Sequence, residues 1–85
     1  MANYKIIFKK SAHKALDDIQ KKDLERIIAK IKKLEVVPRP IGSMKLTNQE
    51  KYRIRQGNYR IIYGIDEEKK IITVVKIGHR KEIYL

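Results

Sequence analysis

The 85-residue chain contains no cysteine, only two prolines and only four glycines. Without cysteine it can form no disulfide bridge, no thiolate zinc site and no cysteine nucleophile. No apolar run approaches the roughly 18 residues that a membrane-spanning helix needs, so we expect no membrane partner. The first residues, MANYKIIFKK, alternate in polarity and lack the apolar block of a secretory signal. These features predict a cytoplasmic protein with one domain, residues 1–85.

The motifs of common enzymes are also missing. Gly57, Gly64 and Gly78 stand apart and form no loop that could cradle phosphates. The two histidines, His13 and His79, lack the spacing of a metal-binding pair. Paired catalytic carboxylates are not evident either, because the acidic residues fall in a polar loop or on a basic helix. The sequence therefore predicts no metal and no small-molecule cofactor.

Positive charge is the property that the chain has in excess. Twenty-one Lys and Arg residues oppose ten Asp and Glu residues, which gives a net charge of +11 and a pI near 10.0. Such a charge attracts polyanions through counterion release. The alternative is a solvated Lys-rich surface with no partner. We expect nucleic acid or an acidic protein as a partner.

The first half of the chain predicts a strand and two helices. Residues 3–10 alternate as a strand does, and Ser11 stands where a helix N-cap would. A break at residues 20–22 leads into a second helix that starts near Asp23 and stops before Pro38 and Pro40. Its apolar stripe, which we expect to be core, comprises Leu24, Ile27, Ile28, Ile31 and Leu34.

The second half alternates with the period of two that strands show. Met44 and Leu46 suggest the start of one strand, and three more follow at 52–55, 59–65 and 71–77. A tight turn at Gly57-Asn58 joins the second and third of these. The sequence predicts an α+β fold of order β-α-α-β-β-β, a helical hairpin packed on a mainly antiparallel four-stranded sheet. The pattern leaves open where the first strand joins this sheet.

Three arginines fall on the strands that this pattern predicts. Arg53 and Arg55 share one face of a strand, about 7 Å apart. Arg60, on the next strand, can lie beside them if the register places it on the same face. Clustered guanidinium groups repel one another unless an anion lies between them, and arginine binds phosphate oxygens bidentately. The alternative is that these residues only solvate the polar face of a half-buried strand.

The segment GHRKEIY, which follows the last apolar strand, holds three further candidates. His79 has a side chain of the type that can help to move a proton, Arg80 can stabilise developing negative charge, and Tyr84 offers a ring for stacking on a base. A metal-free ribonuclease uses groups of these kinds.

The motif GNYRIIY, followed by a charged hairpin and then by GHR, resembles the RelE family of toxins from toxin–antitoxin modules, in the wider RelE/ParE superfamily. The resemblance spans nearly the whole chain. It implies a RelE-like fold and a ribosome-dependent endoribonuclease, an mRNA interferase that cuts messenger RNA in the decoding site. In that chemistry a 2′-hydroxyl attacks the neighbouring phosphate. By position, Arg53 and Arg55 match two basic strand residues, Arg60 and Arg80 match arginines of the motif, and Tyr84 matches a stacking tyrosine.

The chain departs from the family pattern where lysines are replaced by Arg53 and Arg55. Arginine is a poor general base because its guanidinium group stays protonated. Either the cluster acts by electrostatics alone, or His79, Lys51 or Glu50 moves the proton.

Two rival functions fit the same scaffold. ParE-like toxins poison DNA gyrase and cut no RNA, and a non-catalytic RNA-binding protein could use the same basic face. The RelE resemblance implies three partners: a small acidic RelB-like antitoxin, the ribosome and mRNA.

Overall fold

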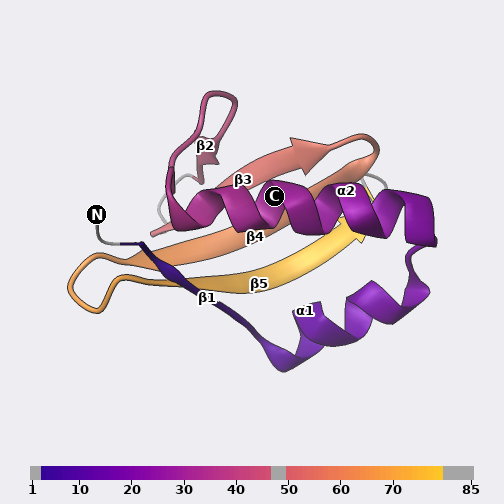
Figure 1. Ribbon diagram of the computed structural model, residues 1–85, viewed down its shortest axis with the longest axis horizontal. Helices are drawn as coiled ribbons and strands as arrows, with labels where there is room; N and C mark the ends of the chain where they lie inside the picture. Colours follow the sequence, from indigo (N-terminus) through magenta and orange to yellow (C-terminus); the bar gives the residue numbers. More distant parts are fainter. Residues whose placement is uncertain (1–2, 47–49, 80–85) are drawn as a thin grey trace.

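The computed structural model of the chain describes residues 3–46 and 50–79, and it consists of helices on one face of a sheet (Figure 1). The elements in chain order are β1 (Lys5–Phe8), α1 (Lys10–Ala15), η1 (Leu16–Asp18), α2 (Lys21–Lys32), η2 (Lys33–Glu35), β2 (Met44–Lys45), β3 (Lys51–Gln56), β4 (Tyr59–Asp66) and β5 (Ile71–His79). Within these two ranges no helix is both long and apolar enough to cross a membrane.

The sheet has the strand order β1-β5-β4-β3-β2. Strand β1 runs parallel to β5, and every other neighbouring pair is antiparallel. The predicted α+β fold with a mainly antiparallel sheet is thus confirmed. The sheet has five strands rather than the four expected, because Met44 and Lys45 pair with β3 as a separate short strand. The first strand lies at the edge beside β5, a position that the sequence pattern left open.

The core lies between the helices and the sheet. Helix α2 contributes Ile27, Ile31 and the following Leu34, all at most 2% exposed, as its apolar stripe predicts. Ile28 differs from this prediction, since it remains 38% exposed at the edge of the stripe. Each residue advances about 100° around a helix, so Ile28 is turned away from the face that Ile27 buries.

Helix α1 begins two residues earlier than expected, and Ser11 does not cap it. The N-cap is Lys9, which makes no side-chain capping bond, and Ser11 lies exposed in the first turn. The Lys9 N–H donates to the Val74 carbonyl at 2.9 Å, which extends the pairing with β5 up to residue 9. The helix therefore starts directly where this pairing ends.

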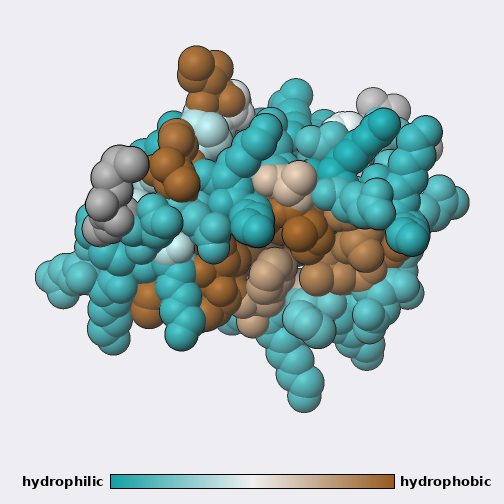
Figure 2. All heavy atoms as spheres, in the orientation of Figure 1, coloured by the Kyte–Doolittle hydropathy of each residue, from teal (hydrophilic) through white to brown (hydrophobic). Residues whose placement is uncertain are grey.

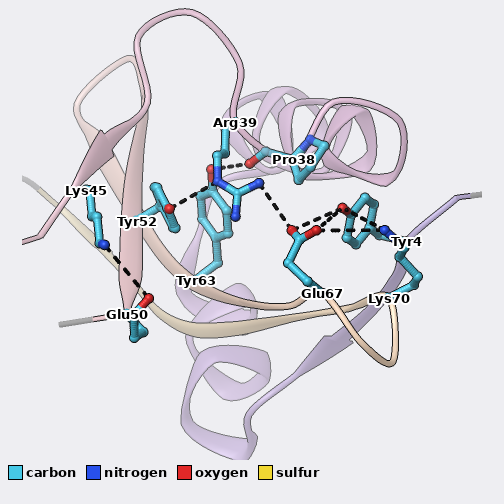
Figure 3. A network of polar contacts seen from close by, with 9 residues as sticks. All are labelled: Tyr4, Pro38, Arg39, Lys45, Glu50, Tyr52, Tyr63, Glu67 and Lys70. Atoms are coloured by element: carbon cyan, nitrogen blue, oxygen red, sulfur yellow. Dashed lines mark hydrogen bonds and ion pairs between the residues drawn. The ribbon is translucent and has the colours of Figure 1, made fainter.

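A polar network fixes the loop between α2 and β2 to the rest of the molecule (Figure 3). The Arg39 guanidinium donates to the Tyr52 hydroxyl at 3.0 Å and forms an ion pair with Glu67 at 3.2 Å. The Tyr4 hydroxyl also donates to Glu67, and this bond is the main reason why the pKa of Glu67 lies below its usual value. The loop is thereby tied to β1, to β3 and to the β4–β5 hairpin.

Tyr63 of β4 also anchors this loop to the sheet. Its side chain is fully buried, and its hydroxyl donates to the Pro38 carbonyl at 2.7 Å. Burial raises the pKa of Tyr63 to about 12, since the interior disfavours the phenolate.

Tyr63→Phe is expected to lower the free energy of unfolding by about 1 kcal/mol at neutral pH, because the Pro38 carbonyl loses its donor. The Tyr63 pKa is higher in the folded than in the unfolded state, so its contribution is complete below about pH 10 and is lost as the pH rises towards 12. The difference in the free energy of unfolding between wild type and Tyr63→Phe should therefore shrink above about pH 10. Urea unfolding of both proteins at a series of pH values measures this difference. A difference that stays constant with pH would contradict the argument that burial raises the pKa of Tyr63.

Candidate nucleic-acid interface

Five basic side chains lie on the face of the sheet opposite the helices, and we call this surface the arginine face. Strand pairing places them there: residues paired across an antiparallel ladder point to the same side, and alternate residues of a strand share a side. The members are Lys51, Arg53 and Arg55 on β3, Arg60 on β4 and Lys76 on β5. The pairing of Arg60 with Arg55 places Arg60 on the same face of the sheet as Arg53 and Arg55.

The centre of the arginine face is a pair of like charges. Arg55 and Arg60 are direct cross-strand partners, so their Cβ atoms are about 5 Å apart. Two like charges in this position destabilise a sheet, and an opposite charge would have been the stabilising choice. An anion between the two guanidinium groups would remove the repulsion and accept hydrogen bonds from both.

The three arginines differ in their surroundings. Arg60 is half-buried and donates to the carbonyl of Tyr59 at 3.3 Å. Arg53 is also half-buried and lies 3.3 Å from the Met44 sulfur, which is a weak acceptor. Arg55 is exposed. The face can therefore bring several N–H donors to one multiply charged group.

Lys76 belongs to the arginine face, although the sequence pattern did not select it. Its Cα is paired with that of Ile62, and the register shifts between Ile62 and Tyr63. This irregularity lets Val74 and Ile77 both enter the core although they are three residues apart. The sequence signal was the single charge within IITVVKI, but strict alternation from the buried Ile72 would place this charge on the helix side of the sheet.

The structure separates His79 from the three arginines. Its Cα is paired with that of Tyr59, and the two rings meet edge to face with centroids 5.7 Å apart. Tyr59 packs against the core, so His79 lies on the face that carries the helices. The other two predicted site residues, Arg80 and Tyr84, lie outside the described residues.

Two alternatives for the proton-moving group can also be placed. Lys51 lies on the arginine face, paired with Gly64. Glu50 is exposed next to it and forms an ion pair with Lys45 at 3.8 Å. Between residues 3 and 46 and between 50 and 79, no group of three or more His, Asp or Glu side chains is arranged to hold a metal ion.

Known proteins resemble this chain in sequence and in structure. Residues 6–84 match the family of ParE toxins of type II toxin–antitoxin systems, parDE. Toxin RelG of Mycobacterium tuberculosis is 36% identical over 33 residues, which are 39% of this chain and 38% of that toxin. The chain thus matches well under half the length of this curated relative.

Two solved structures extend the likeness to the fold. The archaeal RelE–RelB complex from Pyrococcus horikoshii contains a chain that is 28% identical, with a TM-score of 0.80 over 98% of this chain and 100% of that one. A RelBE toxin–antitoxin complex from Mycobacterium tuberculosis contains one that is 22% identical, also with a TM-score of 0.80, over 92% and 99% of the two chains. The resemblance inferred from the GNYRIIY and GHR motifs is thereby confirmed: the chain belongs to the ParE toxin family of type II toxin–antitoxin systems, within the RelE/ParE superfamily.

Proposed function

We propose that this toxin is an endoribonuclease that cuts mRNA in the decoding site of the ribosome and so blocks translation. The observation that carries the proposal is the cross-strand pair Arg55–Arg60, flanked by Arg53 on the same face of the sheet. Three guanidinium groups on one face can bind an RNA phosphate at several oxygens, which a single cation cannot do. The remaining site residues that we propose are His79, Arg80 and Tyr84.

The reaction requires no group beyond the RNA and the protein. The ribose 2′-oxygen bonds to the adjacent phosphorus while the bond from phosphorus to the 5′-oxygen breaks, which leaves a 2′,3′-cyclic phosphate and a free 5′-hydroxyl. The 2′-hydroxyl loses a proton, and the leaving oxygen gains one. Negative charge grows on the phosphate oxygens during this step, and guanidinium groups stabilise it. Arg55 and Arg60 are placed for that role.

Arginine is poorly suited to remove the proton from the 2′-hydroxyl, because the guanidinium group stays protonated. Among the described candidates, Lys51 shares the arginine face, whereas His79 lies on the other side of the sheet. We therefore place stabilisation of charge, rather than proton transfer, at Arg53, Arg55 and Arg60.

The proposal includes the partners of such a toxin. The solved relatives are complexes of RelE with RelB, and a net charge of +11 suits an acidic polypeptide. We propose a small acidic RelB-like antitoxin as the cognate partner, with the ribosome and mRNA as targets in the cytoplasm.

Mapping of cut sites tests this function. Purified toxin is added to ribosomes stalled on a defined message, and new 5′ ends are located by primer extension. We expect cuts inside the codon that occupies the decoding site, and no cuts in the same message without ribosomes. An intact message on ribosomes, in a preparation that is toxic to cells, would exclude the proposal.

The family match to ParE toxins favours one second candidate, inhibition of DNA gyrase. In that case the arginine face would contact the enzyme or its DNA and would perform no chemistry. A supercoiling assay separates the two functions, because an RNA-cutting toxin leaves gyrase active at concentrations that cleave mRNA.

A further inference from the structure

Lys76 is the lysine of the arginine face that lies closest to the arginine pair. Its Cα is paired with that of Ile62, and Arg60 comes two residues before Ile62 on β4. Such diagonal neighbours on one face of an antiparallel pair are about 7–8 Å apart, which long side chains can span. Lys76 is also exposed, so its flexible side chain can extend over the neighbouring part of the face. It therefore lies beside the place that we propose for the phosphate.

The other lysine of this face is farther from the arginine pair. Lys51 is paired with Gly64, which follows Arg60 by four residues on β4. Four residues of a strand extend over about 13 Å, so the backbone of Lys51 is more distant from Arg60 than that of Lys76. Lys51 is also half-buried. Position and exposure thus favour Lys76 over Lys51 as the ammonium group next to the phosphate.

An irregularity of the sheet directs Lys76 to this face. Ile62 is paired with Lys76 and Tyr63 with Val74, so Val75 is an extra residue that has no partner on β4. Regular alternation after the buried Val74 would point the side chain of residue 76 towards the helices. Extra residues of this kind turn side chains to a new direction, and they are frequent next to active sites. The sheet thereby adds a cation to the side that carries the arginines.

Positive charge alone would not single out Lys76. Hydrophilic side chains also spread over the face that carries α2, as Figure 2 shows. Lys76 differs from these by its position next to Arg60. Among residues 3–46 and 50–79, no carboxylate forms an ion pair with its ammonium group. A substrate on the arginine face therefore meets an ammonium group that no described acid has engaged.

The leaving oxygen of the proposed reaction needs a proton donor, and the three arginines are unsuited to this task. A guanidinium group keeps its protons, whereas a lysine ammonium has three N–H groups and serves as an acid in enzymes. We infer that Lys76 gives a proton to the 5′-oxygen of the cleaved linkage while Arg55 and Arg60 hold the phosphate. The inference rests on the proposed ribonuclease function and specifies one residue of its mechanism.

Each proton in this step has a donor and an acceptor. As the bond from phosphorus to the 5′-oxygen breaks, its electron pair stays on that oxygen, which takes up a proton from the Nζ atom of Lys76. The proton of the 2′-hydroxyl passes to water. The neutral amine of Lys76 then recovers a proton from water, so the cycle needs no further reactant.

A message with one altered atom tests the inference. Sulfur replaces the 5′-oxygen of the scissile linkage in the decoding-site codon, and a second message keeps the oxygen. A thiolate leaves readily without a proton, so the sulfur message needs no acid at this position. Ribosomes stalled on each end-labelled message receive saturating toxin, and single-turnover rates are corrected for cleavage in the absence of toxin.

Lys76→Ala is expected to cut the oxygen message about 100-fold more slowly than wild type, because a positioned acid contributes about this much. On the sulfur message it should cut within about threefold of the wild-type rate, since the leaving group no longer needs the acid. Lys76→Arg keeps the charge but does not release a proton, so its loss on the oxygen message should be nearly as large as that of Lys76→Ala.

Two control variants complete the comparison. Arg60→Ala removes a group that stabilises charge on the phosphate oxygens, so its loss should be similar on both messages. Lys69→Ala makes the same chemical change as Lys76→Ala in the exposed turn between β4 and β5, and it should cut both messages at wild-type rates. Thermal unfolding of each variant shows that the fold persists.

Three outcomes would overturn the inference. An equal loss on both messages in Lys76→Ala, or a wild-type rate in Lys76→Arg, would reduce Lys76 to a contact for charge. Rescue by sulfur in Lys51→Ala but not in Lys76→Ala would assign the proton to Lys51. A wild-type toxin that cuts neither message would refute the proposed ribonuclease function itself. A wild type that cuts both, without rescue of Lys76→Ala, would leave that function intact and remove only the role of Lys76.

Discussion

Replacing Arg60 by alanine is expected to lower the rate of mRNA cleavage on ribosomes by about 100-fold or more. Arg60 lies at the centre of the arginine face, between Arg55 on β3 and the side-chain-free Gly78 on β5. A donor that meets charge formed only in the transition state contributes to the rate and little to binding. The loss should therefore appear in the single-turnover rate constant at saturating toxin, measured by primer extension over time.

Two further variants make this result interpretable. Arg60→Lys keeps the charge but loses the planar fork that binds phosphate at two points, so we expect an intermediate rate. Arg26→Ala removes an exposed arginine from α2, on the other side of the sheet, and should cut at the wild-type rate. An equal loss in Arg26→Ala and Arg60→Ala would indicate general attraction of RNA by net charge, with no site on the sheet.

Replacing Ile61 by alanine is expected to lower the free energy of unfolding by about 3 to 4 kcal/mol. Ile61 is completely buried in β4, next to Ile54 of β3 and Ile77 of β5. Its truncation removes apolar area from the core and leaves a cavity that a central strand cannot close. A domain of this size is stable by only about 5 to 15 kcal/mol, so the variant should unfold at a much lower urea concentration.

Ile41→Ala is the matched control for this prediction. It makes the identical chemical change at a side chain that is fully exposed, and the free energy of unfolding should change by less than about 0.5 kcal/mol. Urea unfolding followed by circular dichroism measures both variants. A loss at Ile41 as large as that at Ile61 would mean that the Ile41 side chain packs inside the fold, against its full exposure here.

The faces of the strands could be predicted from the sequence, because side chains alternate strictly along an extended chain. This local rule correctly placed Arg53 and Arg55 on one face of β3, and Tyr52 and Ile54 on the other face. It failed at Lys76, where a change of register breaks the alternation. Alternation from the buried Ile77 places His79 on the helix side of the sheet, away from Arg60, although the two residues lie close along the paired strands.

The predicted site thus mixed residues from two faces. Neighbouring residues of an extended strand point to opposite sides of the sheet, so the closeness of His79 to the arginines along the strands did not place it on their face. No sequence pattern indicated that Val36, Val37 and Ile41 remain exposed in the fold.

By itself the sequence determined the charge of this protein, the order of its helices and strands, and the family to which it belongs, because these follow from composition, from local periodicity and from motifs along the chain. Only the tertiary structure decided that Met44–Lys45 pairs with β3, that β1 lies parallel to β5, and that Arg55 faces Arg60. These features depend on pairing between residues that are distant in the chain or on the register of that pairing. Strand pairing and register depend on how much apolar surface the whole core buries, and a local sequence pattern does not contain this information.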